Sequence, residues 1–280
     1  MIVLSHFQAS QILEARKHGR SGMKLSLDLN LTESEIELEP ECVLFPASER
    51  LNWQSIEEIS RNETACYTVQ DRTAKAIKGF SEFSGRVYGL MPTISAPTML
   101  ISGIPMHRIK DTDPYQDTLN KIKAVAPIKG DVLDTTTGLG YTAIEAAKTA
   151  RHVTTIEIDP TAQEIARMNP WSKALFESPN ITQVVGDAFH EIERFDPESF
   201  SVIIHDPPMF SLAGDLYSLA FYRQAFRVLK RSGRMFHYIG DPDSKSGARV
   251  TAGAIRRLQE AGFKRVVRAP RAFGIVAHKQ

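Results

Sequence analysis

The stretch DVLDTTTGLGYTA, residues 131–143, decides the fold of this chain. Its first residues have the apolar centre of a short buried strand, which ends on Asp134. Gly138 and Gly140 then make a tight loop, and an amphipathic helix is predicted from near Tyr141. A strand, a glycine-rich turn and a helix in this order open a βα unit.

The same alternation continues beyond this unit. The candidate strands are DVLDT, VTTIEI, ITQVV, SVIIHD, RMFHYIG, KRVVRA and FGIVAH, and helical stretches such as YTAIEAAKTA, TAQEIARM and SLAFYRQAFRVLKR separate most of them. This pattern predicts an α/β fold, a doubly wound parallel sheet with helices on both faces. Only APRA separates the last two strands, which is too short for a crossover helix. We therefore expect those two strands to pair antiparallel at one edge.

Residues 1 to about 110 follow a different pattern. A helix is predicted over Ser5 to Lys17. In KLSLDLNLTESEIELEPE, residues 24–41, first Leu and then Glu alternates with other residue types. Such period-two alternation predicts two half-exposed antiparallel strands with a turn near residues 30–34. The sequence thus predicts a smaller β-rich domain over residues 1–110, expected to select the substrate, and an α/β domain over residues 111–280.

Composition excludes several classes of protein. The chain has 280 residues, 42% of them apolar, and a formal net charge of +1, so its overall charge favours neither nucleic acid nor membrane. Cys42 and Cys66 form neither a disulfide framework nor a zinc motif. The start of the chain lacks the pattern of a signal peptide, and no apolar run is long enough to cross a bilayer. We expect a cytoplasmic protein.

Acidic residues stand at the carboxyl ends of the first strands of the predicted α/β sheet. Ligands of open α/β sheets bind at these strand ends. Asp134 would repel the pyrophosphate of a dinucleotide, but it suits a ligand with an ammonium group. S-adenosylmethionine has such a group and no phosphate. Glu157 ends the next strand, where a carboxylate can bind both ribose hydroxyls, whereas Asp159 before Pro160 suits a helix N-cap. Asp187, followed by Ala188, could accept a hydrogen bond from the adenine amino group.

The fourth strand, SVIIHD, ends on Asp206 and is followed by two prolines. A carboxylate there could accept hydrogen bonds from an amino group and orient its lone pair for transfer. Pro207 and Pro208 would hold the acceptor carboxylate on a stiff backbone, and Phe210 could stack on a planar substrate. By strand alternation His205 faces away from Asp206, so we expect it to be hydrogen-bonded within the sheet.

The motifs DTTTGLG, IEIDP, GDA and DPP together resemble those of the class I S-adenosylmethionine-dependent methyltransferases, over roughly residues 115 to 280. DTTTGLGYTAIEA, NPWS, HDPPMFSLAGDLYSLAFYRQAFRVLK and FHYIGDP are most similar to a group of mainly archaeal predicted methyltransferases. The resemblance implies a Rossmann-like fold and methyl transfer to an amino nitrogen, without a metal ion. The cofactor site it implies comprises Asp134, Thr137, Gly138, Gly140, Tyr141, Glu157, Ile158, Asp187 and Ala188, and the catalytic site comprises Asp206, Pro207, Pro208 and Phe210.

Two questions stay open from the sequence. The acidic strand end and the run DLYSLAFYRQAFRVLKRSG are also similar to spermidine synthases, so aminopropyl transfer from decarboxylated S-adenosylmethionine is an alternative. The methyl acceptor is RNA, an amine or a protein side chain. RNA is favoured by the segment 245–279, which has nine Lys or Arg residues and one acidic residue, Glu260.

Overall fold

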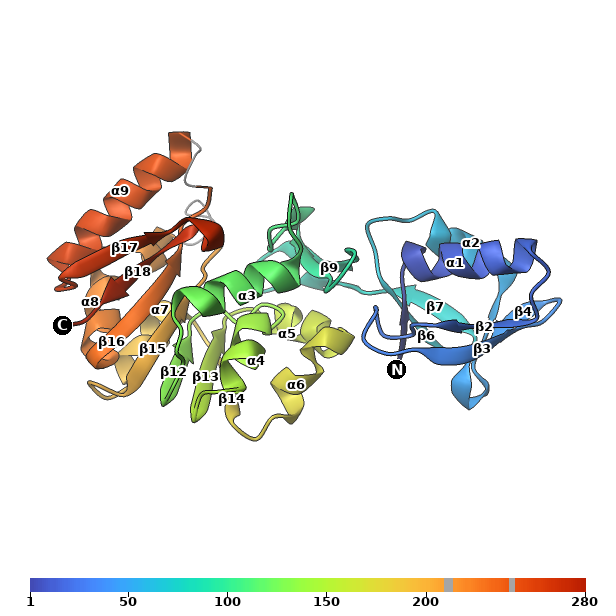
Figure 1. Cartoon of the computed structure of the whole chain (residues 1–280), viewed down its shortest axis with the longest axis horizontal. Coiled ribbons are helices and arrows are strands. Elements are labelled where there is room, and N and C mark those ends of the chain that lie inside the picture. Colours follow the sequence, from blue (N-terminus) through green and yellow to red (C-terminus); the bar gives the residue numbers. More distant parts are fainter. Residues whose placement is uncertain (209–213, 242–244) are drawn as a thin grey trace. The chain divides into compact units, whose positions relative to one another are not determined.

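The computed structural model describes residues 1–208, 214–241 and 245–280 (Figure 1). The chain divides into two compact units, one of Met1–Tyr115 with Thr161–Lys173, and one of Gln116–Pro160 with Ala174–Gln280. The first unit therefore includes most of α5 (Pro160–Arg167), which the sequence assigned to the α/β part. The predicted division into residues 1–110 and 111–280 stays a prediction.

Besides most of α5, the first unit contains three small antiparallel sheets and two further α-helices. Its sheets have the strand orders β1-β6-β7, β2-β3-β4-β5 and β11-β10-β9-β8. The strands are β1 (Ile2–Leu4), β2 (Gly22–Leu25), β3 (Ser34–Leu38), β4 (Cys42–Leu44), β5 (Arg50–Asn52), β6 (Tyr67–Gln70), β7 (Thr73–Ala76), β8 (Lys78–Ser81), β9 (Arg86–Met91), β10 (Thr98–Ile101) and β11 (Ile104–Pro105). The two further helices are α1 (His6–Lys17) and α2 (Trp53–Ser60), which lie side by side (Figure 1).

Local sequence explains these elements. Ser5 caps α1 in a capping box with Gln8, which confirms the predicted helix. In β3, Ile36 and Leu38 are buried while Glu35 and Glu37 are exposed. The alternating glutamates of this strand therefore lie on a solvated face. The core between the helices and sheets is apolar and includes Ile12, Leu25, Val43, Leu51 and Ile56.

One strand prediction was wrong. The alternating leucines predicted a strand through Leu31, but β2 ends at Leu25. The reason is Asp28, whose Oδ1 accepts the backbone N–H groups of Leu31 and Thr32 at 3.1 and 2.8 Å. These bonds close a loop in which Leu29 and Asn30 have positive φ.

The second unit is built on a seven-stranded sheet with the order β14-β13-β12-β15-β16-β18-β17. The strands are β12 (Asp131–Asp134), β13 (His152–Glu157), β14 (Ile181–Val185), β15 (Phe200–His205), β16 (Leu229–Tyr238), β17 (Arg265–Ala269) and β18 (Gly274–His278). Every predicted strand is present. β18 pairs antiparallel with both β16 and β17, which confirms the antiparallel edge.

Helices cover both faces of this sheet (Figure 1). They are α3 (Pro114–Ala124), α4 (Tyr141–Ala147), α6 (Lys173–Glu177), α7 (Ala188–Glu191), α8 (Leu219–Val228) and α9 (Lys245–Glu260). The core on one face joins side chains of β12, β13, β15 and β16 to α7, α8 and α9 and includes Leu133, Ile203, Phe221 and Leu258. The predicted doubly wound α/β fold is confirmed.

The strand order fixes where a site can form. From β12 the chain continues to β13 and β14 on one side and then crosses to β15 on the other. The ends of the parallel strands coincide, because Asp134 pairs in register with Thr155 and with Ile204, and Glu157 pairs with Val185. In open α/β sheets this reversal of strand order is the place where ligands bind.

Candidate active site

The loop after β12 is fixed by backbone hydrogen bonds to its neighbouring strands. Thr135 N–H donates to Ile204 O at 3.1 Å, and Thr137 N–H donates to Ile156 O at 2.8 Å. Gly138 and Gly140 have φ values of 52° and 78°, a left-handed conformation that favours glycine. The loop therefore has one defined path over the strand ends.

Asp134 lies beneath this loop. It has no exposed surface, and its Oδ2 accepts the hydroxyls of Thr142 at 3.0 Å and Thr155 at 3.2 Å. Burial raises the pKa of Asp134 to about 7, although these hydroxyls favour the ionised form. Thr137 and Tyr141 are also buried. In this conformation Asp134 positions the loop and offers no surface for direct contact with a ligand.

Glu157 links the end of β13 to the loop. Its Oε2 accepts the backbone N–H of Gly138 at 2.8 Å, and its Oε1 accepts the N–H of Asp159 at 3.1 Å. Burial raises the pKa of Glu157, and the two N–H groups partly oppose this shift. The side chain is half-buried, and the neighbouring Ile158 is 43% exposed. Each carboxylate oxygen can accept a second hydrogen bond, so Glu157 could still bind hydroxyls of a ligand.

Asp187 follows β14 and caps α7. Its Oδ1 accepts the N–H of Phe189 at 2.9 Å, so Asp187 is the N-cap of α7. Gly186 N–H donates to Glu157 O at 2.9 Å, which keeps this turn beside the end of β13. Ala188 is buried and Asp187 is half-exposed.

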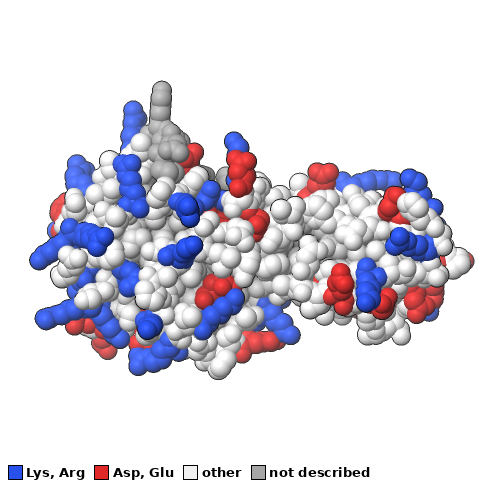
Figure 2. All heavy atoms as spheres, in the orientation of Figure 1, with Lys and Arg blue, Asp and Glu red and all other residues white. Residues whose placement is uncertain are grey.

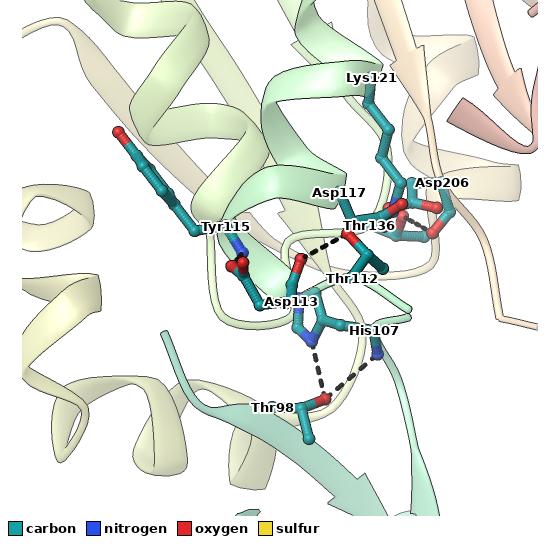
Figure 3. A network of polar contacts seen from close by, with 9 residues as sticks. All are labelled: Thr98, His107, Thr112, Asp113, Tyr115, Asp117, Lys121, Thr136 and Asp206. Carbon is teal, nitrogen blue, oxygen red and sulfur yellow. Dashed lines mark hydrogen bonds and ion pairs between the residues drawn. The ribbon is translucent and has the colours of Figure 1, made fainter. Parts of the chain in front are cut away.

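Asp206 follows β15 and is bound to a buried lysine (Figure 3). Lys121 Nζ lies 2.6 Å from Oδ2 of Asp206 and 2.8 Å from Oδ2 of Asp117. Burial raises the pKa of Asp206, and the nearby ammonium of Lys121 partly offsets this shift. The backbone carbonyl of Asp206 accepts the hydroxyl of Thr136 at 2.8 Å.

The two prolines after Asp206 continue this rigid support. Pro207 is buried, and the carbonyl of Pro208 accepts the hydroxyl of Tyr217 at 3.1 Å. Phe210, which we expected to stack on the substrate, lies outside the described residues.

The histidine beside Asp206 belongs to the interior of the sheet. His205 Nε2 hydrogen-bonds Leu216 O at 2.9 Å, and Nδ1 hydrogen-bonds the hydroxyl of Thr135 at 2.7 Å. Burial lowers the pKa of His205 to about 3, so it is neutral. The expectation that it is a hydrogen-bonded sheet residue is confirmed. His237 is also fully buried and hydrogen-bonds the hydroxyl of Tyr222 at 2.8 Å.

The chain is similar to several known proteins. The model of the family "Methyltransferase small domain" matches residues 117–242. The "Uncharacterized protein MJ1233" of Methanocaldococcus jannaschii is 46% identical over 261 residues, which cover 91% of this chain and 88% of that protein. The chain belongs to the MJ1233 family, and its residues 117–242 match a class I methyltransferase domain.

This MJ1233-family chain is also similar to a polyamine aminopropyltransferase and to spermidine synthases. The "Polyamine aminopropyltransferase 2" of Streptomyces coelicolor is 31% identical over 122 residues, which cover 41% of this chain and 22% of that protein. A spermidine synthase in complex with the transition-state analogue AdoDATO has a TM-score of 0.59 at 19% identity, with 80% of this chain and 85% of that one covered. The spermidine synthase of Thermotoga maritima has a TM-score of 0.58 at 18% identity, with 80% and 84% covered. At these identities the two structures show a shared fold.

Sequence reasoning missed two residues of this candidate site, Asp117 and Lys121. Their i, i+4 spacing is that of an ordinary surface ion pair on a helix. The available signal was their register, because positions 117, 118 and 121 lie on one buried face of α3, and Val125 directly after the helix is also buried.

Two kinds of feature are absent from the described residues. Within residues 1–208, 214–241 and 245–280, no group of three or more His, Cys, Asp or Glu side chains is arranged to hold a metal ion. Among the helices in these same ranges, none has the length and apolar character needed to span a membrane.

Proposed function

We propose that this chain transfers the methyl group of S-adenosylmethionine to an amino nitrogen. The observation that carries the proposal is that one loop is hydrogen-bonded to both strand ends. Gly138 binds Glu157 on one side, and Thr136 binds Asp206 on the other. A cofactor held at Glu157 and an acceptor held at Asp206 would therefore meet over the same short segment.

The residues around the loop fit this cofactor. A Cβ at Gly138 would meet no other described atom within 4 Å, so the backbone is open to a ligand there. Glu157 would bind the ribose hydroxyls, and Asp187 with Ala188 would border the adenine. Ile158 provides an exposed apolar surface beside Glu157. The acidic strand ends suit a sulfonium and an ammonium, and they disfavour a pyrophosphate.

Asp206 would hold and orient the acceptor. When bound, S-adenosylmethionine supplies a methyl group on a sulfonium sulfur, which is a good leaving group. The acceptor nitrogen donates its lone pair to the methyl carbon, and the carbon–sulfur bond breaks with its electron pair staying on sulfur. The nitrogen then loses a proton to Asp206 or to water. Thr136 and Pro207 keep the backbone of Asp206 in place for this role.

RNA is the acceptor that surface charge favours. Lys and Arg gather over α9 and β17, where few acidic side chains appear (Figure 2). The exposed basic residues of this surface are Arg249, Arg256, Lys264, Arg265, Arg268 and Arg271. Such a surface can bind phosphates through electrostatic attraction and release of counterions.

Aminopropyl transfer is the second candidate, favoured by the match to the Streptomyces aminopropyltransferase. It would use decarboxylated S-adenosylmethionine and the same amine-orienting carboxylate. The segment PPMF stands where spermidine synthases have a second acidic residue, which weighs against this candidate.

The proposal is tested by offering the protein methyl-labelled S-adenosylmethionine or decarboxylated S-adenosylmethionine, together with RNA, a polyamine mixture or unfolded protein. We expect labelled RNA, and we expect about a hundredfold slower transfer by Asp206→Ala with little change in cofactor affinity. Aminopropylated polyamine would establish the second candidate instead. Transfer at an unchanged rate by Asp206→Ala would refute the role of Asp206.

The RNA assignment has a matched charge control. Arg265→Glu with Arg268→Glu should weaken RNA binding and flatten its dependence on salt concentration. Arg20→Glu with Lys24→Glu reverses two exposed charges in the first unit and should change binding much less. Equal effects of the two pairs would remove α9 and β17 as the RNA surface.

A further inference from the structure

The site contains a lysine that the proposed reaction does not use. Lys121 shares its ammonium between Asp117 and Asp206 (Figure 3). Its Nζ also lies 4.9 Å from the centre of the Tyr238 ring. The side chains of Lys121 and Asp117 are 3% and 0% exposed, whereas that of Asp206 is 20% exposed. Asp206 is therefore the member of this triad that can reach a ligand.

Lys121 is a fixed positive charge. Burial disfavours its charged form, but the carboxylates of Asp206 and Asp117 outweigh this effect and hold its pKa above the ordinary value. With both carboxylates ionised, the triad has a net charge of −1. An acceptor that approaches Asp206 therefore meets a carboxylate that already has an ammonium partner.

The geometry sets how close the two nitrogens come. Lys121 is bonded to Oδ2 of Asp206, so an acceptor N–H that leaves this pair intact goes to Oδ1. With hydrogen bonds of about 2.8 Å on each oxygen, the acceptor nitrogen lies roughly 5 Å from Lys121 Nζ. Repulsion from Lys121 would lower the affinity for a second ammonium at that distance about a hundredfold, relative to the same carboxylate without the lysine. An uncharged N–H donor makes the same hydrogen bond without this loss.

We propose that Lys121 is a specificity-determining residue that admits uncharged amino groups as acceptors and excludes aliphatic polyamines, which are ammonium ions at neutral pH. This inference rests on the proposed function, because it requires Asp206 to face the acceptor. It narrows the acceptor to a planar, neutral amine such as the exocyclic amino group of a nucleobase.

A purely structural triad would behave differently. If Lys121 only stabilised the fold, its replacement would change the free energy of unfolding but not the relative affinity for neutral and cationic amines. The double variant Asp117→Asn with Lys121→Met separates these roles. It removes one negative and one positive charge, so the net charge of the triad stays at −1 while the ammonium beside Asp206 is gone.

The experiment is a titration of the protein saturated with S-adenosylhomocysteine, with putrescine as the cationic probe and adenosine as the neutral probe. We compare the wild type, the double variant and Lys121→Arg, which keeps the charge. We expect putrescine to bind the double variant at least about tenfold more tightly than the wild type. Adenosine affinity should change by less than about threefold, and Lys121→Arg should behave as the wild type.

The outcomes separate the inference from the function on which it rests. If S-adenosylhomocysteine binds but putrescine binds the wild type and the double variant with equal affinity, the inference is wrong and the proposed function stands. If S-adenosylhomocysteine does not bind the wild type, both fail. Should the double variant not fold, Asp117→Asn with Lys121→Gln replaces it, since this pair also keeps the net charge at −1 and the Gln amide can donate to Asp206, and the same gain for putrescine is required.

Discussion

Gly138 donates its backbone N–H to Oε2 of Glu157 at 2.8 Å, and this bond joins the loop after β12 to the end of β13. Two residues earlier, Thr136 donates its hydroxyl to the backbone carbonyl of Asp206, also at 2.8 Å. One loop thereby holds the ends of the two strands that flank β12. The ends of β13 and β15 are thus each tied to this loop by a short hydrogen bond between a backbone group and a side chain.

The two glycines of this loop are expected to differ in what their replacement damages. Gly140 has a φ of 78°, and a Cβ there would lie 2.7 Å from Cδ2 of Leu175, so Gly140→Ala should lower the free energy of unfolding by about 2 kcal/mol. At Gly138 the φ is 52°, and a Cβ would meet no described neighbour within 4 Å, so Gly138→Ala should cost about 1 kcal/mol.

Ligand binding should reverse this order. A Cβ at Gly138 would occupy the open side of the loop, so Gly138→Ala should weaken S-adenosylmethionine binding about tenfold, while folded Gly140→Ala should bind within about threefold of the wild type. Denaturant unfolding and calorimetric titration measure the two effects. Unchanged cofactor affinity in Gly138→Ala would mean that the ligand does not lie over this loop.

Lys121 should contribute strongly to stability. Lys121→Ala leaves Asp117 and Asp206 buried without their cation, so we expect the free energy of unfolding to fall by about 3 kcal/mol. Lys148→Ala is the control, because Lys148 has an equally short bond of 2.6 Å to Glu145 but is 58% exposed. That exposed pair should contribute less than about 1 kcal/mol. Equal losses in the two variants would show that burial does not strengthen the Lys121 pairs.

Asp134 should make stability depend on pH. Its pKa is raised to about 7 in the folded chain, whereas an aspartate in an unfolded chain titrates near pH 3.9. Between these values the folded state binds a proton that the unfolded state has released. This group therefore makes the free energy of unfolding fall as pH rises from about 4 to 7, and adds no slope above that range.

The variant Asp134→Asn isolates this contribution. The difference in unfolding free energy between wild type and variant should fall across that pH range by at most about 4 kcal/mol, because one pKa unit corresponds to about 1.4 kcal/mol. Denaturant unfolding at several pH values measures this difference. A difference that does not vary with pH would show that Asp134 titrates normally in the folded protein.

Local patterns in the sequence were sufficient to predict most of the fold. The apolar run Val202 to Ile204 became β15, and the four-residue connection APRA required an antiparallel pair. The alternation of leucines after Leu25 was misleading, because it did not reveal the hydrogen bonds that Asp28 makes to Leu31 and Thr32. A side-chain oxygen that closes a loop is hard to recognise from a period-two pattern.

The candidate site was predictable only in part. Parallel strand ends meet at one edge, so the positions of Glu157 and Asp206 followed from strand order. Asp134 is fully buried and hydrogen-bonded to Thr142 of α4 and Thr155 of β13. The sequence alone does not show that these two hydroxyls lie beside it. The pairing of Lys121 with Asp206 joins residues 85 positions apart, and periodicity along α3 cannot identify such a partner.

The central claim is that Glu157 binds S-adenosylmethionine at the strand ends, and calorimetric titration tests it most directly. Wild-type protein should bind S-adenosylmethionine and S-adenosylhomocysteine with micromolar affinity. Glu157→Ala should lose at least about tenfold, and the exposed control Glu164→Ala should lose nothing measurable. Absence of binding to the wild type, or equal affinity for both ligands in Glu157→Ala and the wild type, would contradict the account.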